Sequence, residues 1–256
     1  MTTKVPNELL EIGVLADATN FTDSILISQN ASTGTLDAAT NNTGLGDTVF
    51  AALTSGDNNV GIGADSLKAL TTGASNVAVG KSSLEANTTA SNNTAVGESS
   101  LKSNTTGASL TAVGLGALED NTTASNNTAV GFKSLNKNTT GADNTALGHT
   151  CLKVNTTGIE NVAIGHGCMV VNTTGSYNTS MGVAALDANT TGGLNVAIGN
   201  GALSANTTAD NNTAVGTNAL LVNTTGTSNV AIGALASDAS TTASENTAVG
   251  YASLSA

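Results

Sequence analysis

Hydrophobic and polar positions recur along this chain with a fixed step of seventeen residues. The clearest marker is a glycine after a short apolar stretch, and it occurs thirteen times, from Gly46 to Gly250, without insertion or deletion. Before the glycine, runs such as "NTAVG" alternate in side-chain size, which predicts a short β-strand. A leucine four positions after the glycine and an "NTT" triplet complete most units. Such a fixed period is typical of repeat architectures.

The unit length predicts an all-β fold, a parallel β-roll or β-solenoid with thirteen 17-residue coils. Seventeen residues are too few for a helix–turn–helix repeat or a propeller blade, and Gly, Asn and Thr are poor helix formers. Stacked coils would lie about 4.8 Å apart and form a rod of roughly 60 Å. The roll is expected over residues 23–256, with regular coils from about residue 42. An imperfect first unit begins at residues 23–28. Its spacing to the next unit is one residue longer than the regular seventeen. Residues 1–22 do not fit and are interpreted as an N-terminal attachment arm.

Because no unit changes length, each position forms a column along the rod, numbered here from the glycine as position 0. Larger aliphatic residues or Thr at −3 and −1 are expected to face inward, together with Leu at +4. The Ala at −2, as in Ala95, then faces outward and stays small because a second copy of the chain approaches it. Position +1 varies freely and is expected to face solvent. The Asn columns suit turns and are expected to hydrogen-bond to one another from coil to coil.

Composition narrows the classes of partner. Seven Lys and no Arg stand against eighteen acidic residues, giving a net charge of −11. This balance argues against a nucleic-acid partner and against an anionic membrane surface. No apolar run reaches the eighteen residues of a membrane span, and the N-terminus is a poor secretory signal. Synthesis in the cytoplasm, without membrane insertion, is therefore expected.

Two His and two Cys form the one set of candidate metal ligands. His149 with Cys151 and His166 with Cys168 sit at the same positions of adjacent units, and imidazole and thiolate suit zinc. If position +1 faces water and +3 faces inward, the four groups do not converge. The favoured interpretation is therefore two thiols that replace Ser or Ala, with no cofactor. The four-residue zinc site is kept as the minor alternative.

Other motifs receive structural explanations. "NTT" matches the N-glycosylation sequon nine times, but its strict period favours a role in the turn of each coil. The threonines also suggest an ice-binding rod, yet adjacent residues such as Thr88 and Thr89 point to opposite faces of a strand, which leaves a single row. No Ser-His-Asp or Cys-His set is visible, so we expect no enzymatic activity.

The unit N-[TV]-A-[VI]-G-x-x-[AS] resembles the YadA-like head repeats of trimeric autotransporter adhesins, over about residues 24–256. The longer "NTTGxxNTAVGxxAL" form is similar to repeats of bacteriophage tail-fibre and other virion proteins. The resemblance implies a left-handed β-roll that forms a homotrimer and has no enzymatic activity. This sequence has a longer unit than the adhesins and shows neither their heptad-patterned stalk nor their membrane anchor. These departures favour a virion protein.

The expected function is thus that of a phage virion structural protein, a trimeric spike, fibre or capsid decoration protein that serves attachment or particle protection. It would be made in the host cytoplasm and would bind other virion proteins through the N-terminal arm. Variable columns would contact a host receptor or glycan, with Phe132, His149, His166 and Tyr251 as candidates. The alternatives are a bacterial trimeric adhesin head at the cell surface and an ice-binding rod.

Overall fold

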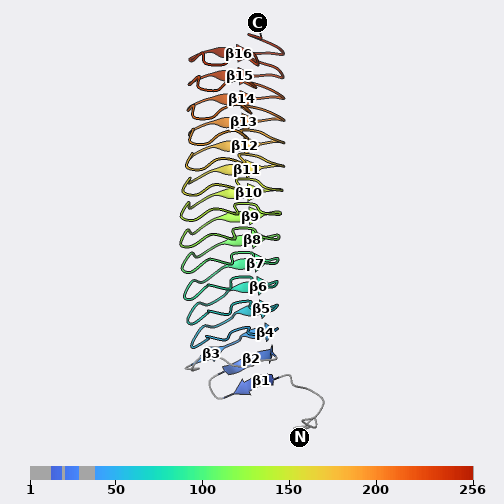
Figure 1. Ribbon diagram of the computed structural model, residues 1–256, viewed down its shortest axis with the longest axis vertical. Coiled ribbons are helices and arrows are strands. Elements are labelled where there is room, and N and C mark those ends of the chain that lie inside the picture. The colour runs from blue at the N-terminus through green and yellow to red at the C-terminus, as the bar shows by residue number, and fades with distance from the viewer. Residues whose placement is uncertain (1–12, 19–20, 29–37, 256) are drawn as a thin grey trace.

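The computed structural model describes residues 13–18, 21–28 and 38–255, the first two ranges as backbone only. Within these residues the protein is a parallel β-solenoid of seventeen-residue coils, seen as a vertical stack in Figure 1. No helix in the described ranges is long and apolar enough to cross a membrane. The strands are β1 (Gly13–Ala18), β2 (Phe21–Ser28), β3 (Ala39–Thr40), β4 (Thr43–Leu45), β5 (Val60–Ile62), β6 (Val77–Val79), β7 (Thr94–Val96), β8 (Thr111–Val113), β9 (Thr128–Val130), β10 (Thr145–Leu147), β11 (Val162–Ile164), β12 (Thr179–Met181), β13 (Val196–Ile198), β14 (Thr213–Val215), β15 (Val230–Ile232) and β16 (Thr247–Val249).

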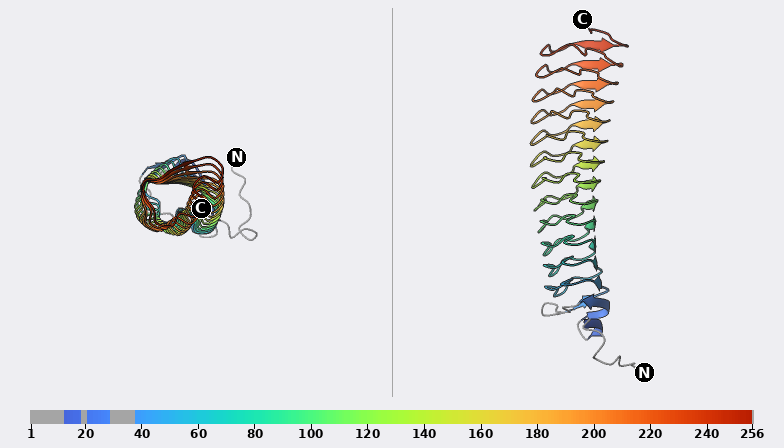
Figure 2. Two further views of the ribbon diagram at one scale, coloured as in Figure 1. Left: turned by 90° about the horizontal axis from the view of Figure 1, so that it is seen from above. Right: turned by 45° about the vertical axis from the view of Figure 1, so that its right-hand side comes forward.

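Strands β4 to β16 form one parallel ladder in which every residue pairs with its equivalent seventeen positions later. In β10 and β11, for example, Thr145 pairs with Val162 and Ala146 with Ala163. Seen along the rod, the coils superpose in one rounded outline (Figure 2, left). In the side view the strands lie in a single column (Figure 2, right). The predicted fold class is therefore confirmed.

Backbone hydrogen bonds also join the coils outside the three-residue strands. The N–H of Gly97 donates to Val79 O of the preceding coil at 2.7 Å, whereas the N–H of Leu101 donates to Ala117 O of the following coil at 3.0 Å. Because buried backbone groups need partners, this two-way pairing lets most of each coil stay regular without long strands.

The N-terminal end of the sheet is a hairpin. Strand β1 pairs antiparallel with β2, and β2 pairs parallel with β4, so that Ile25 lies opposite Thr43, eighteen positions later. This offset confirms the prediction that the first unit is one residue further from its successor. The expected boundary between arm and roll falls inside β2. Residues 1–12, most of the predicted arm, lie outside the described residues.

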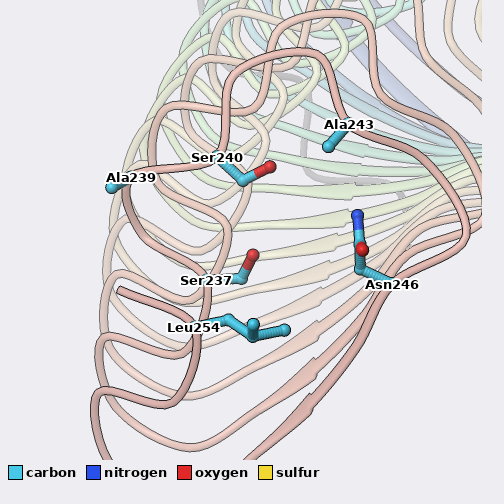
Figure 3. Close-up of a pocket in the computed structure, with 6 residues that line it drawn as sticks. All are labelled: Ser237, Ala239, Ser240, Ala243, Asn246 and Leu254. Carbon is cyan, nitrogen blue, oxygen red and sulfur yellow. The ribbon is translucent and has the colours of Figure 1, made fainter. Parts of the chain in front are cut away.

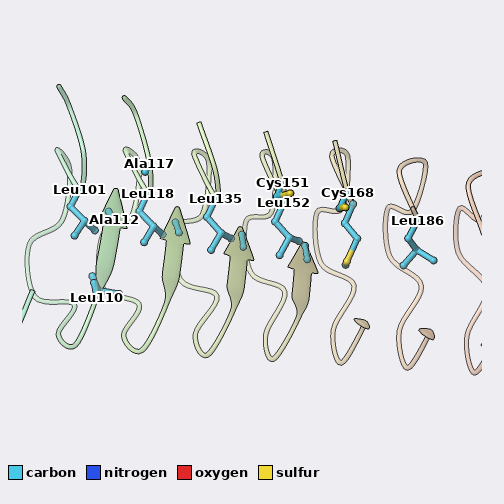
Figure 4. Packing of buried hydrophobic residues seen from close by; sticks show 14 of the residues in the cluster. Leu101, Leu110, Ala112, Ala117, Leu118, Leu135, Cys151, Leu152, Cys168 and Leu186 are labelled. Carbon is cyan, nitrogen blue, oxygen red and sulfur yellow. The ribbon is translucent and has the colours of Figure 1, made fainter. Parts of the chain in front are cut away.

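A column of leucines at position +4 forms one side of the interior, as predicted. Leu101, Leu118, Leu135 and Leu152 are fully buried and follow one another along the rod in Figure 4. Each has a positive φ, near 50°, which costs an L-residue about 1–2 kcal/mol. Full burial of a leucine side chain contributes about 1.5–3 kcal/mol and offsets that cost.

The side chains of the strands point the opposite way from the prediction. Ala95 and its equivalents at −2 are fully buried, while Thr94 at −3 and Val96 at −1 are half-buried. The prediction that −3 and −1 point inward and Ala points outward is therefore wrong, and so is the idea that a second copy packs on the Ala column.

The interior is too narrow at this wall for a larger residue. The limited space is clearest at Gly61, where an added Cβ would lie 2.8 Å from Val49 Cγ1 and 3.4 Å from Phe50 Cζ. Val49 and Phe50 are larger than the residues found at these positions in later coils, and the −2 column correspondingly shrinks from Ala to Gly beside them. Close packing tolerates little excess volume, so the interior selects a small side chain at −2.

Two buried columns of Asn side chains join the coils, as the sequence predicted. At position −4, Asn161 Nδ2 donates to Asn144 Oδ1 at 3.1 Å and to Gly175 O at 2.9 Å. Its Oδ1 accepts the backbone N–H of Asn178 at 3.0 Å. Leu110 interrupts this column once and still donates its backbone N–H to Asn93 Oδ1.

The second Asn column contains the "NTT" asparagines at position +7. Asn155 Nδ2 donates to Asn138 Oδ1 at 2.8 Å and to Gly158 O at 2.9 Å. These amides are buried and bonded, which supports the structural interpretation of the triplet over glycosylation. Where Ser240 replaces Asn, the Oδ1 of Asn223 has no hydrogen-bond partner.

Candidate functional site

The candidate sites in the described part of the chain are two recesses and the His and Cys side chains of adjacent coils. No group of three or more His, Cys, Asp or Glu side chains among them is placed to hold a metal ion. The recess at the C-terminal end measures about 230 Å³ and lies where the last coil leaves the interior uncovered (Figure 3). Its lining has no titratable side chain and consists of Ser237, Ala239, Ser240, Ala243, Asn246 and Leu254.

A shallow groove near the N-terminal end carries alternating charges. Lys68, Glu85 and Lys102 occupy position +5 of successive coils and line a groove of about 440 Å³. Lys102 Nζ lies 3.9 Å from Glu85 Oε2, and Lys68 Nζ lies 3.0 Å from Asp65 Oδ1. Hydrogen bonds from the Thr48 hydroxyl and then from Lys68 lower the pKa of Asp65. The charges in this groove therefore largely neutralise one another.

The structure separates the four candidate zinc ligands into two environments. His149 and His166 are exposed at position +1, whereas Cys151 and Cys168 at +3 are fully buried and not oxidised to a disulfide. Each thiol donates to a backbone carbonyl of the next coil, Cys168 to Gly182 O at 2.6 Å. The hydrogen bond with Cys168 and then burial raise the pKa of Cys151. The thiols thus occupy the small interior column, on the other side of the chain from the imidazoles.

Three of the four predicted contact residues meet in one stack on the outer surface. The rings of Phe132 and His149 stack with centroids 5.1 Å apart, and those of His149 and His166 with centroids 4.9 Å apart. Lys133 Nζ lies 5.4 Å from the centre of the Phe132 ring. Tyr251 is also exposed but belongs to the last coil, five coils beyond His166.

This stack is the middle of a larger exposed ridge. Leu115 precedes it and Val183 follows it at position +1, with 45% and 48% of their surfaces exposed. We call these five residues the +1 ridge: Leu115, Phe132, His149, His166 and Val183. Apart from Tyr251, position +1 in the other coils is small, polar or charged. The ridge is therefore a local feature of five coils and no part of the repeat pattern.

A second surface, which was not predicted from the sequence, runs the whole length of the ladder. The outward columns of β4 to β16 hold only Thr or Val at −3 and only Leu, Val, Ile or Met at −1. Several are well exposed, among them Leu45, Met181 and Ile232. We call these two columns the strand face. It carries no charge in any of the thirteen coils, although the chain as a whole has a net charge of −11.

No protein-family model, no curated protein and no solved structure matches this chain.

Proposed function

We propose that this protein is a non-enzymatic structural rod of a bacteriophage particle, a left-handed homotrimer whose subunits associate through the strand face. The observation that carries the proposal is that face: two unbroken, uncharged columns of Thr and aliphatic side chains on a regular sheet. Contiguous exposed apolar surface marks interaction sites. The family resemblance supplies the handedness, the number three and the virion setting.

Self-association fits the distribution of charge. Copies with a net charge of −11 repel one another through most of their surfaces, and close approach is least costly where charge is absent. The strand face meets this condition along its whole length. A closed ring of copies would cover the face on every subunit and leave none exposed for further growth.

In this arrangement the +1 ridge is a surface for display. Aromatic residues are enriched at the centre of binding interfaces, and Phe132 with its two stacked imidazoles provides such a group beside Lys133. The ridge would contact a host receptor or glycan, while residues 1–22 would attach the rod to other virion proteins.

The homotrimer is tested by the mass of the native protein in solution. The expected value is three times the chain mass of 24.9 kDa. The variant Val196→Asp/Ile198→Asp places two charges on the strand face and should give monomers or insoluble protein. The matched control Asn200→Asp/Asn211→Asp adds the same charge at exposed positions off the face and should stay trimeric. A stable wild-type monomer would refute the proposal.

The virion setting needs a separate experiment. Purified particles of the phage whose genome encodes this chain should yield its tryptic peptides at a fixed stoichiometry. Their absence from the particles, with the peptides present in the infected cells, would count against a virion protein. Recovery from a bacterial outer surface instead would favour the adhesin head, the leading alternative.

An ice-binding rod is the second alternative, and one observation favours it. Position +9 carries an exposed threonine in eleven successive coils, from Thr72 to Thr242. The hydroxyls at +8 are not available in the same way, because they donate to backbone carbonyls of the next coil, as Thr105 does to Thr122 O at 3.0 Å. A single exposed row is a narrow surface for ordering water. Thermal hysteresis of a purified solution tests this function, and its absence would dismiss it.

A further inference from the structure

We propose that His149 and His166 form a binding site for a borderline divalent transition-metal ion, Cu²⁺, Ni²⁺ or Zn²⁺, on the outside of the roll. This site consists of two imidazoles and excludes both cysteines. It is independent of the homotrimer and of the virion setting, because both ligands come from one chain.

The backbone fixes the two histidines beside each other. They occupy position +1 of adjacent coils, two residues after the last residues of β10 and β11, Leu147 and Ile164, which pair in register. After the histidines, the N–H of Gly167 donates to His149 O at 3.0 Å. The rings lie nearly parallel, at 6°, with centroids 4.9 Å apart. Since register is held on both sides, the backbone keeps the two histidines one coil apart, and rotation about the side-chain bonds sets the distance between the rings.

The surroundings leave room for an ion. Both histidines are exposed, so an ion can approach the pair from solvent. His149 Nδ1 lies 3.2 Å from the Thr150 hydroxyl, a contact that favours Nε2 as the metal-binding nitrogen. The ring of Phe132 supports the other side of His149.

Imidazole nitrogen is the commonest metal ligand in proteins and suits zinc, copper and nickel. With metal–nitrogen bonds of about 2.0–2.1 Å, two tetrahedral ligand atoms lie roughly 3.3 Å apart. The stacked rings must therefore tilt toward each other from their 4.9 Å centroid spacing, which exposed side chains can do by rotation. Water would complete the coordination. Among these ions Cu²⁺ should bind most tightly, since affinities of nitrogen sites follow Ni²⁺ < Cu²⁺ > Zn²⁺.

The buried thiols do not take part. Cys151 and Cys168 lie inside the coil, and each donates to a backbone carbonyl of the next coil. Reaching an ion outside the roll would break these bonds and open the interior. A bound ion would instead connect two adjacent coils from the outside and add to stability by mass action, because it binds only where the coils are stacked.

The test is calorimetric titration of the full chain with NiCl₂, with ZnSO₄ and CuSO₄ as further probes. One ion per chain is expected. His149→Asn should weaken binding at least about tenfold, since even loss of a partner outside the coordination shell commonly costs that much.

Two rearranged variants keep the number of histidines constant. His149→Asn/Asn200→His places the imidazoles two coils apart and should bind as weakly as His149→Asn. His149→Asn/Val183→His creates a new adjacent pair with His166 and should restore wild-type affinity within about threefold. Circular dichroism confirms that each variant is folded. Equal affinity in both rearranged variants, or no binding by the wild-type chain, would overturn the proposal.

Discussion

The interior and the exterior of this roll follow opposite rules. At the interior position −4, twelve of thirteen coils carry Asn and one carries Leu110; at the exterior position +1, the same coils carry eleven residue types. The interior side chains bond or pack against the next coil, as Asn161 does with Asn144 and Asn178. The exterior side chains mostly face water. At these two positions, repetition accompanies contact between coils and variation accompanies exposure to solvent.

This comparison predicts that substitutions at contact columns are far more costly than the same substitutions elsewhere. The largest effect is expected at the glycine column. Gly97 has a φ of 133°, and a Cβ there would lie 2.6 Å from the carbonyl carbon of Gly114. Gly97→Ala should reduce the free energy of unfolding by more than about 3 kcal/mol, because backbone must move.

Gly167 is the matched control for that glycine. It also has a positive φ, 65°, but a Cβ there meets nothing within 4 Å. Gly167→Ala should cost only about 1 kcal/mol, the strain of the left-handed conformation. Urea unfolding of both variants measures the difference. Equal losses would mean that the close approach of Gly114 adds nothing measurable to the cost at Gly97.

The next largest effect is expected in the Asn column. Asn161→Ala leaves the buried N–H of Asn178 without its acceptor and removes three side-chain hydrogen bonds. A buried unpaired donor costs about 1–3 kcal/mol, and each lost bond adds to this, so a loss of about 3 kcal/mol is expected. Asn200→Ala, the same change at exposed position +1, should shift unfolding by less than about 0.5 kcal/mol.

A smaller effect concerns the interior thiols. Cys151 is fully buried, so a thiol reagent at pH 8 should label it at least about 100-fold more slowly in the native protein than in the unfolded chain. Because folding raises the pKa of Cys151 from 9.0, the unfolded chain releases this proton first. Stability should therefore fall as the pH rises above about 9. Rapid native labelling would place the thiol outside the coil.

The smallest effect is expected on the +1 ridge. Phe132→Ala removes an exposed ring that stacks on His149, which should cost less than about 1 kcal/mol. Under the proposed display role of the ridge, binding of a receptor or glycan should decrease far more than stability does. A variant that unfolds instead would show that the stack serves the fold.

Much of this architecture can be predicted from the sequence, because the seventeen-residue period has no insertion or deletion. The parallel stack, the Asn columns, the buried leucines and the eighteen-residue first step all follow from the repeat. The facing of the strand does not, because alternation shows that Ala163 and Val162 point to opposite sides without showing which side is inside. The larger side chains at −3 and −1 suggested that these positions face the interior, which is wrong. The sequence does contain a signal for the correct facing. Position −2 is Gly instead of Ala at Gly44 and Gly61, near the larger Val49 and Phe50, which indicates that position −2 shares the interior with these side chains.

The candidate surfaces were partly predictable for the same reason. The freedom of position +1 pointed to Phe132, His149 and His166, and their common column placed them in neighbouring coils. The strand face was not predicted, because its residues at −3 and −1 were expected to point into the interior. Strand β1 lies outside the repeat, so the period carried no information about it.

The unfolding free energy of two neighbouring variants tests the central claim most directly. If Ala163 faces the narrow interior and Val162 the outside, Ala163→Val should cost about 1–3 kcal/mol through overpacking. Val162→Thr, which places there the residue found at −3 in most coils, should cost less than about 0.5 kcal/mol. A tolerated Ala163→Val together with a destabilising Val162→Thr would contradict the account and return the Ala column to the surface.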